Sequence, residues 1–372
     1  MNRDFLYVGT FPRAYHTDTT DSAFGLYSFS RGWGATSLVA VEMLPAPRPG
    51  WIAVHPSRRF LYAVNEVGNF EGGPGGGVSA FGVDRATGAL RALNSHPTPP
   101  LPCHCGVDAS GRFLMVATFG GGSVHLFPLG PDGRIGPEAD AHHHRGSSVH
   151  PRRQLAPHAH SIYIDPGNRF VLVPDLGIDQ IVVYELDSAH GRLVPHPERN
   201  VPLSPGSGPR HLTFDPQGRF AYLMNEMSAT ISVFAYDGST GGMREIQSVD
   251  LLPVGFAGLR SGAAVNIHPD GRFLYATTRS HTSSGEPPVR GIDALIWFEI
   301  GAEDGRLQRR GSVPSGGEIP RDFTFDPTGE HLLVGHQGSG NIVTFRIDRE
   351  FGTPAQVGDA LSTPVPVSLR FL

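Results

Sequence analysis

The chain has 372 residues, of which 48 are glycine and 33 are proline, a composition typical of turn-rich β proteins rather than helical ones. Charged residues make up only 17% of the chain and the formal net charge is −5, which argues against nucleic acid as a partner, because nucleic-acid binding needs a basic surface. No apolar run approaches the roughly 18 residues of a membrane span, and residues 1–11 lack a basic-then-apolar signal region, so we expect no membrane partner and a cytoplasmic location.

The first predicted strand covers residues 5–11 ("FLYVGTF"). A longer phrase then recurs: an apolar strand, Asp or His, a turn that usually holds Pro, Gly-Arg-Phe, and a second apolar strand. The phrase occupies residues 51–66, 105–119, 161–176, 211–226, 265–279 and 323–337. Its second strands begin at Phe60, Phe113, Phe170, Phe220, Phe273 and His331, which is a period of roughly 50 residues. Each phrase is followed by one or two further strands, such as 230–237 ("TISVFAYD").

The two ends of the chain complement each other. Residues 5–11 resemble a second strand without a first, and residues 364–372 ("PVPVSLRFL") resemble a first strand without a second. Joined, they complete a seventh unit and leave no exposed sheet edge. A period near 50 residues with about four strands per unit is typical of a β-propeller. The sequence therefore predicts an all-β, seven-bladed β-propeller, formed by residues 1–372 as one domain and closed by the C-terminal strand in the N-terminal blade.

Two positions of the repeat lie at the same rim, because the first and second strands form a hairpin. The position five residues before the turn residue carries Gly50, Cys103, His160, Arg210, Ala263, Arg321 and Val367. The position eleven residues after it carries Glu66, Phe119, Leu176, Glu226, Arg279, Gln337 and Phe11. A scaffold position would be similar in every blade, whereas these alternate between apolar and charged residues. His158 lies two residues before His160, on the same side if the strand extends that far.

This rim offers a consistent chemistry. Two converging arginines, Arg210 and Arg279, would bind a phosphate or carboxylate through forked donors. A histidine can exchange a proton near neutral pH, and Glu226 can orient an arginine or activate a water. Inter-blade salt bridges and hydrogen bonds in a polar rim are the structural alternative, and the spacing leaves both open.

Four segments carry a resemblance to a known family. They are "RRQLAPHAHS", "GPRHLTFDPQGRFAYLMNE", "NIHPDGRFLYATTR" and "IPRDFTFDPTGEHLLVGHQ". They resemble the lactonase family of seven-bladed propellers, which includes bacterial 6-phosphogluconolactonases and the fungal 3-carboxy-cis,cis-muconate lactonising enzyme. The resemblance implies a catalytic set of His158 or His160 with Arg210, Glu226 and Arg279. The family's Asn-Arg pair is Thr278-Arg279 here, which bears on substrate specificity.

The resemblance implies hydrolysis of a small anionic sugar lactone, such as 6-phosphogluconolactone, without a metal or a cofactor. Glu66, Arg321 and Gln337 are expected to contact the substrate. Lactonisation of a carboxylated muconate at the same site and a non-enzymatic binding scaffold are the alternatives. A calcium-dependent six-bladed lactonase fits neither the seven repeats nor the lack of a carboxylate cluster. The sequence does not indicate an oligomeric state.

Weaker signals have simpler interpretations. The histidine-rich segment 141–150 ("AHHHRGSSVH") could bind metal but is expected to be a solvated loop. Cys103 and Cys105 are too close for a relaxed disulfide and lack further zinc ligands, so we expect two buried small residues. The glycine-rich segment 69–77 lacks the Lys-Ser/Thr of a phosphate loop and is expected to be a flexible hairpin. No Gly-x-Ser-x-Gly elbow is present.

Overall fold

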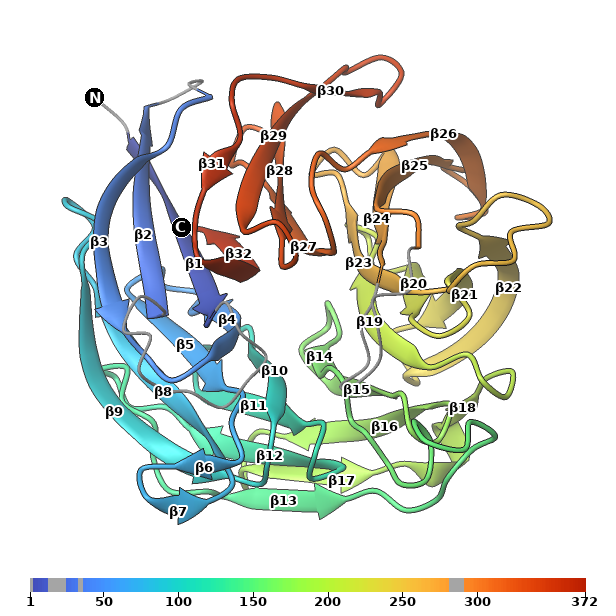
Figure 1. Cartoon of the computed structure of the whole chain (residues 1–372). Helices are drawn as coiled ribbons and strands as arrows, with labels where there is room; N and C mark the ends of the chain where they lie inside the picture. The colour runs from blue at the N-terminus through green and yellow to red at the C-terminus, as the bar shows by residue number, and fades with distance from the viewer. Residues whose placement is uncertain (1–2, 13–24, 33–35, 281–290) are drawn as a thin grey trace.

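Seven antiparallel sheets form a ring in the described part of the chain, which comprises residues 3–12, 25–32, 36–280 and 291–372 of a computed structural model (Figure 1). We number the sheets as blades 1 to 6 after the six repeat phrases, and the sheet that holds both chain ends is blade 7. The strands nearest the axis are β4 (Pro49–Val54), β10 (Pro102–Val107), β14 (Tyr163–Ile164), β19 (Pro209–Phe214), β23 (Gly262–Ile267), β27 (Pro320–Phe325) and β32 (Val365–Phe371). The second strands are β5 (Phe60–Asn65), β11 (Phe113–Thr118), β15 (Phe170–Asp175), β20 (Phe220–Asn225), β24 (Phe273–Thr278), β28 (His331–His336) and β1 (Arg3–Phe11).

Two further layers complete each blade. The third strands are β8 (Gly76–Val83), β12 (Ser123–Pro128), β16 (Gln180–Asp187), β21 (Thr230–Asp237), β25 (Ala294–Ile300), β29 (Asn341–Ile347) and β2 (Gly25–Gly32). The outer strands are β9 (Leu90–Thr98), β13 (Asp140–His143), β17 (Arg192–Pro195), β22 (Gly242–Asp250), β26 (Leu307–Pro314), β30 (Pro354–Gln356) and β3 (Val39–Pro45). Short strands β18 (Val201–Pro202) and β31 (Leu361–Ser362) add to blades 3 and 6, and β6 (Asn69–Phe70) pairs with β7 (Gly73–Pro74).

The only helical element among the described residues is a 3-10 turn at Pro197–Arg199. That part of the chain contains no helix of the length and apolar character needed to cross a membrane.

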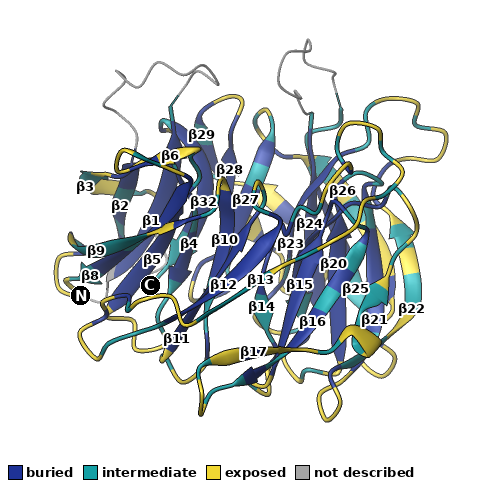
Figure 2. Cartoon of the chain, turned by 90° about the horizontal axis from the view of Figure 1, so that it is seen from below, coloured by how far each residue is buried: buried dark blue, intermediate teal, exposed yellow. Residues whose placement is uncertain are grey.

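The core lies between the blades. Every residue of β5, β11, β15, β20, β24 and β28 is buried, whereas the outer strands are largely exposed or intermediate (Figure 2). Each of the larger apolar clusters joins two neighbouring blades, as Tyr222 and Met224 of blade 4 do with Leu274 and Ile296 of blade 5. Strands buried on both faces have continuous apolar sequences, which explains the uninterrupted second strands of the repeat.

The recurring Asp and Gly-Arg-Phe residues stabilise the turn and the contact between blades. In blade 3, Asp165 Oδ1 accepts hydrogen bonds from the backbone N–H groups of Arg169 and Phe170, both at 2.7 Å. The Arg169 guanidinium lies 4.8 Å from the centre of the Phe170 ring. The same ring also meets Gly241 of blade 4, whose φ is +73° and where a Cβ atom would lie 2.7 Å from the ring. The repeat motif therefore encodes a tight inter-blade contact.

Strands from the two ends of the chain close the ring. β1 pairs with β32, and Leu6 lies opposite Phe371 while Val8 lies opposite Leu369. This confirms the predicted seven-bladed all-β architecture and its closure. The contact between blades 6 and 7 has an apolar part, in which Leu6 and Leu369 pack with Leu333. It also has a buried polar part, because His331 replaces the repeat's phenylalanine and Asp326 bonds to the buried Arg31 of β2.

Candidate active site

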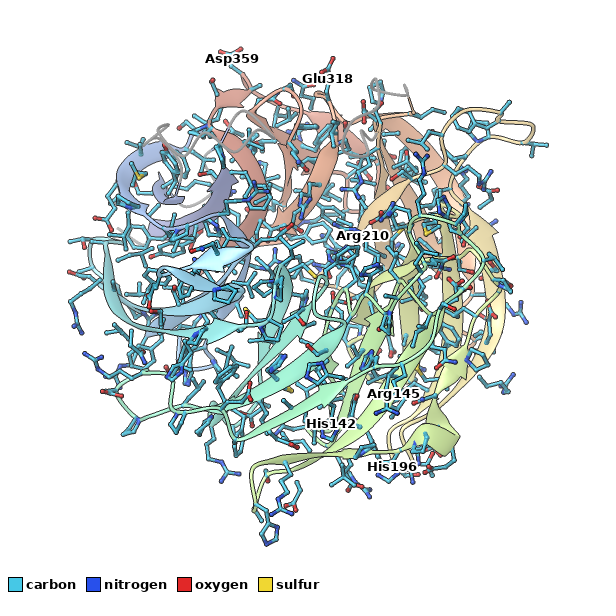
Figure 3. All side chains as sticks on the ribbon, turned by 60° about the horizontal axis from the view of Figure 1, so that its bottom comes forward. His142, Arg145, His196, Arg210, Glu318 and Asp359 are labelled. Atoms are coloured by element: carbon cyan, nitrogen blue, oxygen red, sulfur yellow. The ribbon has the colours of Figure 1, made fainter. Side chains whose placement is uncertain are left out.

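A β-bulge lies at the predicted rim of every blade. In blade 4, Pro209 pairs with Asn225 but His211 pairs with Met224, so Arg210 is an extra residue on the inner strand. The same one-residue shift occurs in the other six blades. A bulge bends a strand and redirects a side chain. Arg210 accordingly lies near the middle of the ring, whereas His142, Arg145 and His196 lie toward its outer edge (Figure 3).

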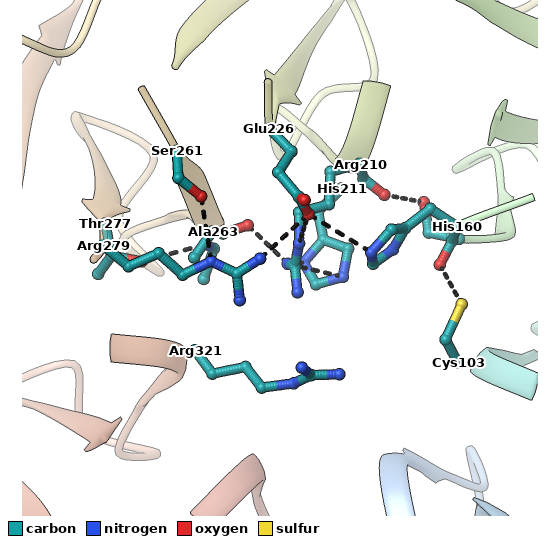
Figure 4. Close-up of polar contacts among 12 residues, drawn as sticks. Cys103, His160, Arg210, His211, Glu226, Ser261, Ala263, Thr277, Arg279 and Arg321 are labelled. Atoms are coloured by element: carbon teal, nitrogen blue, oxygen red, sulfur yellow. Dashed lines mark hydrogen bonds and ion pairs between the residues drawn. The ribbon is translucent and has the colours of Figure 1, made fainter. Parts of the chain in front are cut away.

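Glu226 is the centre of the predicted catalytic set. It directly follows β20, and its backbone N–H donates to the Gly208 carbonyl at 2.7 Å. Its Oε2 accepts hydrogen bonds from Arg210 Nε at 3.0 Å and Arg279 Nη2 at 3.1 Å (Figure 4). Its Oε1 accepts one from Arg153 Nη2 at 2.7 Å. One buried carboxylate thus binds three guanidinium groups from three separate parts of the chain.

The charges around Glu226 determine its protonation. Burial alone would raise the pKa of Glu226, but the positive charges of Arg153, Arg279 and Arg210 outweigh it and hold the pKa well below its usual range. The carboxylate is therefore ionised at neutral pH and is a weak base. Its role in this arrangement is to hold the three arginines in place.

His160 lies beside this carboxylate. Its Nε2 is 3.7 Å from Glu226 Oε2, and its backbone N–H donates to the Pro174 carbonyl at 2.9 Å. Burial, followed by the charge of Arg210, holds the pKa of His160 well below 6.5. The imidazole is therefore neutral at pH 7 and can accept a proton.

His158 lies in a different environment. Its Nδ1 donates to the Phe119 carbonyl at 2.8 Å, and its ring stacks on the Phe119 ring with the centres 4.3 Å apart. Although β14 begins only at Tyr163, Ala159 forms an isolated bridge with Asp175, and the His160 ring also contacts the Phe119 ring, with the centres 5.7 Å apart. Both histidines therefore lie beside Phe119, as strand alternation predicts. The structure brings His160, Arg210, Glu226 and Arg279 together and places His158 against Phe119.

The three predicted substrate-contact residues form a second group. Arg321 Nη2 donates to Glu66 Oε2 at 3.2 Å, and Arg321 Nη1 donates to Gln337 Oε1 at 3.3 Å. The guanidinium lies 5.4 Å from the centre of the Phe11 ring. Figure 4 shows Arg321 across from Arg210 and Arg279. The glycine at the blade 1 bulge leaves room for Glu66, since a Cβ atom at Gly50 would lie 2.5 Å from its Oε2.

Arg153 is a site residue that the sequence patterns did not indicate. It lies in the connection between blades 2 and 3, outside both rim positions, although it is part of the segment "RRQLAPHAHS". The adjacent Gln154 anchors the segment that carries Arg153. It is fully buried, and its Nε2 donates to the Leu176 carbonyl at 2.8 Å.

The structure also shows where the histidine-rich segment, the two cysteines and the glycine-rich segment lie. In the histidine-rich segment, His144 Nδ1 lies 2.6 Å from Asp175 Oδ2 and its Nε2 lies 3.0 Å from the Tyr184 hydroxyl. The described residues include no group of three or more His, Cys, Asp or Glu side chains placed to hold a metal ion. Cys103 and Cys105 are buried free thiols, as expected. Segment 69–77 contains the β6–β7 hairpin.

Comparison with known proteins places this chain in a family. The family model described as "Lactonase, 7-bladed beta-propeller" matches residues 5–371. The chain belongs to this lactonase family. Among the lactonase-family relatives, a protein of Bacillus subtilis named 6-phosphogluconolactonase is 32% identical, covering 100% of this chain and 99% of the relative. A protein of Serratia proteamaculans with the same name is 31% identical over 86% of this chain and 88% of its own.

A solved structure of a protein named as a gluconolactonase is also similar. The periplasmic gluconolactonase of Pseudomonas aeruginosa superposes with a TM-score of 0.89 at 30% identity, covering 100% of this chain and 99% of that chain. The names of these three proteins refer to lactone hydrolysis. They favour neither the muconate lactonising reaction nor a non-enzymatic scaffold.

Proposed function

We propose that this protein hydrolyses a small anionic sugar lactone, and that 6-phosphogluconolactone is the first substrate to test. The observation that carries the proposal is the buried Glu226 carboxylate, which holds three arginines beside the neutral His160. The names of the full-length relatives support the same reaction.

The residues support a simple acyl-transfer mechanism. His160 Nε2 takes a proton from a water molecule while the water oxygen bonds to the carbonyl carbon of the lactone. The carbonyl electrons move onto its oxygen, and the guanidinium of Arg210 or Arg279 stabilises this oxyanion. Collapse of the intermediate breaks the bond between the carbonyl carbon and the ring oxygen, and that oxygen takes the proton from His160. The negative charge of Glu226, whose Oε2 lies 3.7 Å from the same Nε2, stabilises the transient imidazolium.

We also propose that residues 1–372 act as one domain. The catalytic set comes from blades 3, 4 and 5 and from the segment before blade 3, while Glu66, Arg321 and Gln337 come from blades 1 and 6. We propose in addition that the protein is cytoplasmic. One relative of the same fold is named as periplasmic, so family membership does not decide the compartment.

The experiment is a panel of phosphorylated and unphosphorylated sugar lactones, assayed with and without a chelator. We expect the purified protein to accelerate hydrolysis of 6-phosphogluconolactone, and the chelator to leave the rate unchanged. Glu226→Gln, which keeps the size but removes the charge that holds the arginines, should lower kcat by about 100-fold or more. A rate no higher than the spontaneous one for every lactone would refute the proposal, and turnover of a carboxymuconate instead would identify the alternative reaction.

A further inference from the structure

The three arginines around Glu226 differ in exposure. The side chains of Arg210 and Arg279 are 2% and 3% exposed, whereas that of Arg153 is 30% exposed. Arg210 Nη1 also donates to the Ala263 carbonyl at 2.7 Å, and Arg279 Nε donates to Ser261 Oγ at 3.4 Å. The two buried arginines therefore bond protein groups besides Glu226, and Arg153 is the arginine of this group that is most exposed to solvent.

The charge of this group matches a dianion. Arg153, Arg210 and Arg279 carry three positive charges against the one negative charge of Glu226, which leaves a net charge of +2. His160 adds nothing, because burial and Arg210 hold its pKa well below 6.5. The neighbouring Arg321 and Glu66 neutralise each other. A phosphate monoester carries roughly −1.5 to −2 near pH 7, whereas a carboxylate would leave one positive charge uncompensated.

The position of Arg153 is fixed by its own segment. His150 Nδ1 accepts a hydrogen bond from the Arg153 backbone N–H at 3.1 Å. Gln154 Oε1 accepts one from the His150 backbone N–H at 3.1 Å. Ser148 Oγ donates to Asp179 Oδ2 at 2.6 Å, which attaches the segment to blade 3. The backbone of Arg153 is thus held by its segment and the guanidinium by Glu226, which lowers the entropic cost of binding.

We propose that Arg153 binds the phosphate group of the substrate and determines the preference for phosphorylated over unphosphorylated lactones. This inference rests on the proposed lactone hydrolysis. A guanidinium binds phosphate through two parallel N–H donors. The phosphate would lie at the exposed side of the group, and the lactone carbonyl would lie toward the buried arginines.

The test compares kcat/KM for 6-phosphogluconolactone and for glucono-δ-lactone in the wild-type protein, Arg153→Gln, Arg153→Lys and the matched control Arg152→Gln. Arg153→Gln should lower the ratio of the two kcat/KM values by about 10- to 100-fold. Arg153→Lys, which keeps the charge but not the fork, should restore part of the ratio, and Arg152→Gln, at the exposed neighbouring position, should preserve it.

An equal loss for both lactones would overturn the inference, because it would mean that Arg153 only positions Glu226. An unchanged ratio would overturn it as well. Calorimetric binding of 6-phosphogluconate and of gluconate separates this inference from the proposed function. Even if the wild-type protein hydrolysed no lactone, selective loss of 6-phosphogluconate binding in Arg153→Gln would support the phosphate site, and unchanged binding would refute it.

Discussion

The two histidines of the segment Pro-His-Ala-His have different chemical environments although one residue separates them. His160 lies 3.7 Å from the Glu226 carboxylate, and that carboxylate can stabilise a positive charge on the ring. His158 stacks on Phe119 and donates to its carbonyl oxygen. The distances therefore favour His160 as the residue that transfers the proton.

This assignment leads to a prediction for two matched variants. His160→Gln should lower kcat for the lactone by about 100-fold or more, because a general base is lost. His158→Gln should lower it by less than about tenfold, since His158 contacts the site only through Phe119. Steady-state kinetics on the best substrate of the panel will measure both. The reverse order of the two effects would assign proton transfer to His158.

At the scale of elements, the bulge gives the scaffold a position whose side chain can vary. Gly50, Cys103, Arg210 and Arg321 occupy equivalent bulges. Their side chains differ in charge and size, while the flanking strands pair in the same way. The blade architecture therefore tolerates different residues at the position that forms the site.

The segment that carries Arg153 depends on one buried side chain. Gln154 Nε2 donates to the Leu176 carbonyl and its Oε1 accepts from the His150 backbone N–H. Gln154→Leu should leave both backbone groups unsatisfied and reduce the free energy of unfolding by about 1–3 kcal/mol. Hydrogen exchange should quicken at residues 148–155 but not in β20. Unchanged exchange in this segment would contradict the anchoring role of Gln154.

At the scale of the whole molecule, buried histidines make stability depend on pH. Burial, aided by the charge of Arg210 or Arg370, holds the pKa values of His104, His160 and His211 well below 6.5. These three rings lie together, since the centre of the His211 ring is 5.4 Å from that of His160 and 5.8 Å from that of His104. The charges that face them are those of Arg210, Arg279, Arg321, Arg370 and Glu226.

The unfolded chain binds protons at these histidines below about pH 6.5, while the folded chain does not. Their contribution to stability is therefore complete above pH 6.5 and is lost as the pH falls. Between pH 6.5 and 5, each histidine should reduce the free energy of unfolding by up to about 1.4 kcal/mol per pH unit. His104→Gln should reduce this slope in chemical denaturation measured at several pH values. Equal slopes in the wild-type protein and His104→Gln would contradict the prediction.

Much of the fold could be predicted from the sequence because its signals are local and repeated. The Asp turn and Gly-Arg-Phe recur in successive blades, and each satisfies backbone groups or packs against the next blade within a short distance. The rim positions of Arg210, Glu226 and Arg279 could also be predicted, because they lie at fixed distances in sequence from the turn residue of each repeat. Arg153 could not be predicted in this way, because its contact with Glu226 joins a non-repeating segment to another blade.

The bulge and the different polar partners of the two histidines were also beyond the sequence. A bulge is a shift in pairing between two strands, and no residue type marks it here, since glycine, cysteine and arginine all occupy it. Alternation places His158 and His160 on one side, beside Phe119, but it does not indicate which of them lies beside Glu226. Likewise, the polar contact between blades 6 and 7 depends on Arg31, which is distant in sequence from His331.

The shared carboxylate of Glu226 has a consequence for the order of folding. Arg210 lies on the neighbouring strand, but Arg153 and Arg279 belong to other parts of the chain. Before those parts dock, Glu226 and the arginines cannot leave water without a large desolvation cost. Neighbouring strands can pair early, whereas the four charged groups can be buried only together. This charged group can therefore form only when blades 3, 4 and 5 are docked against one another.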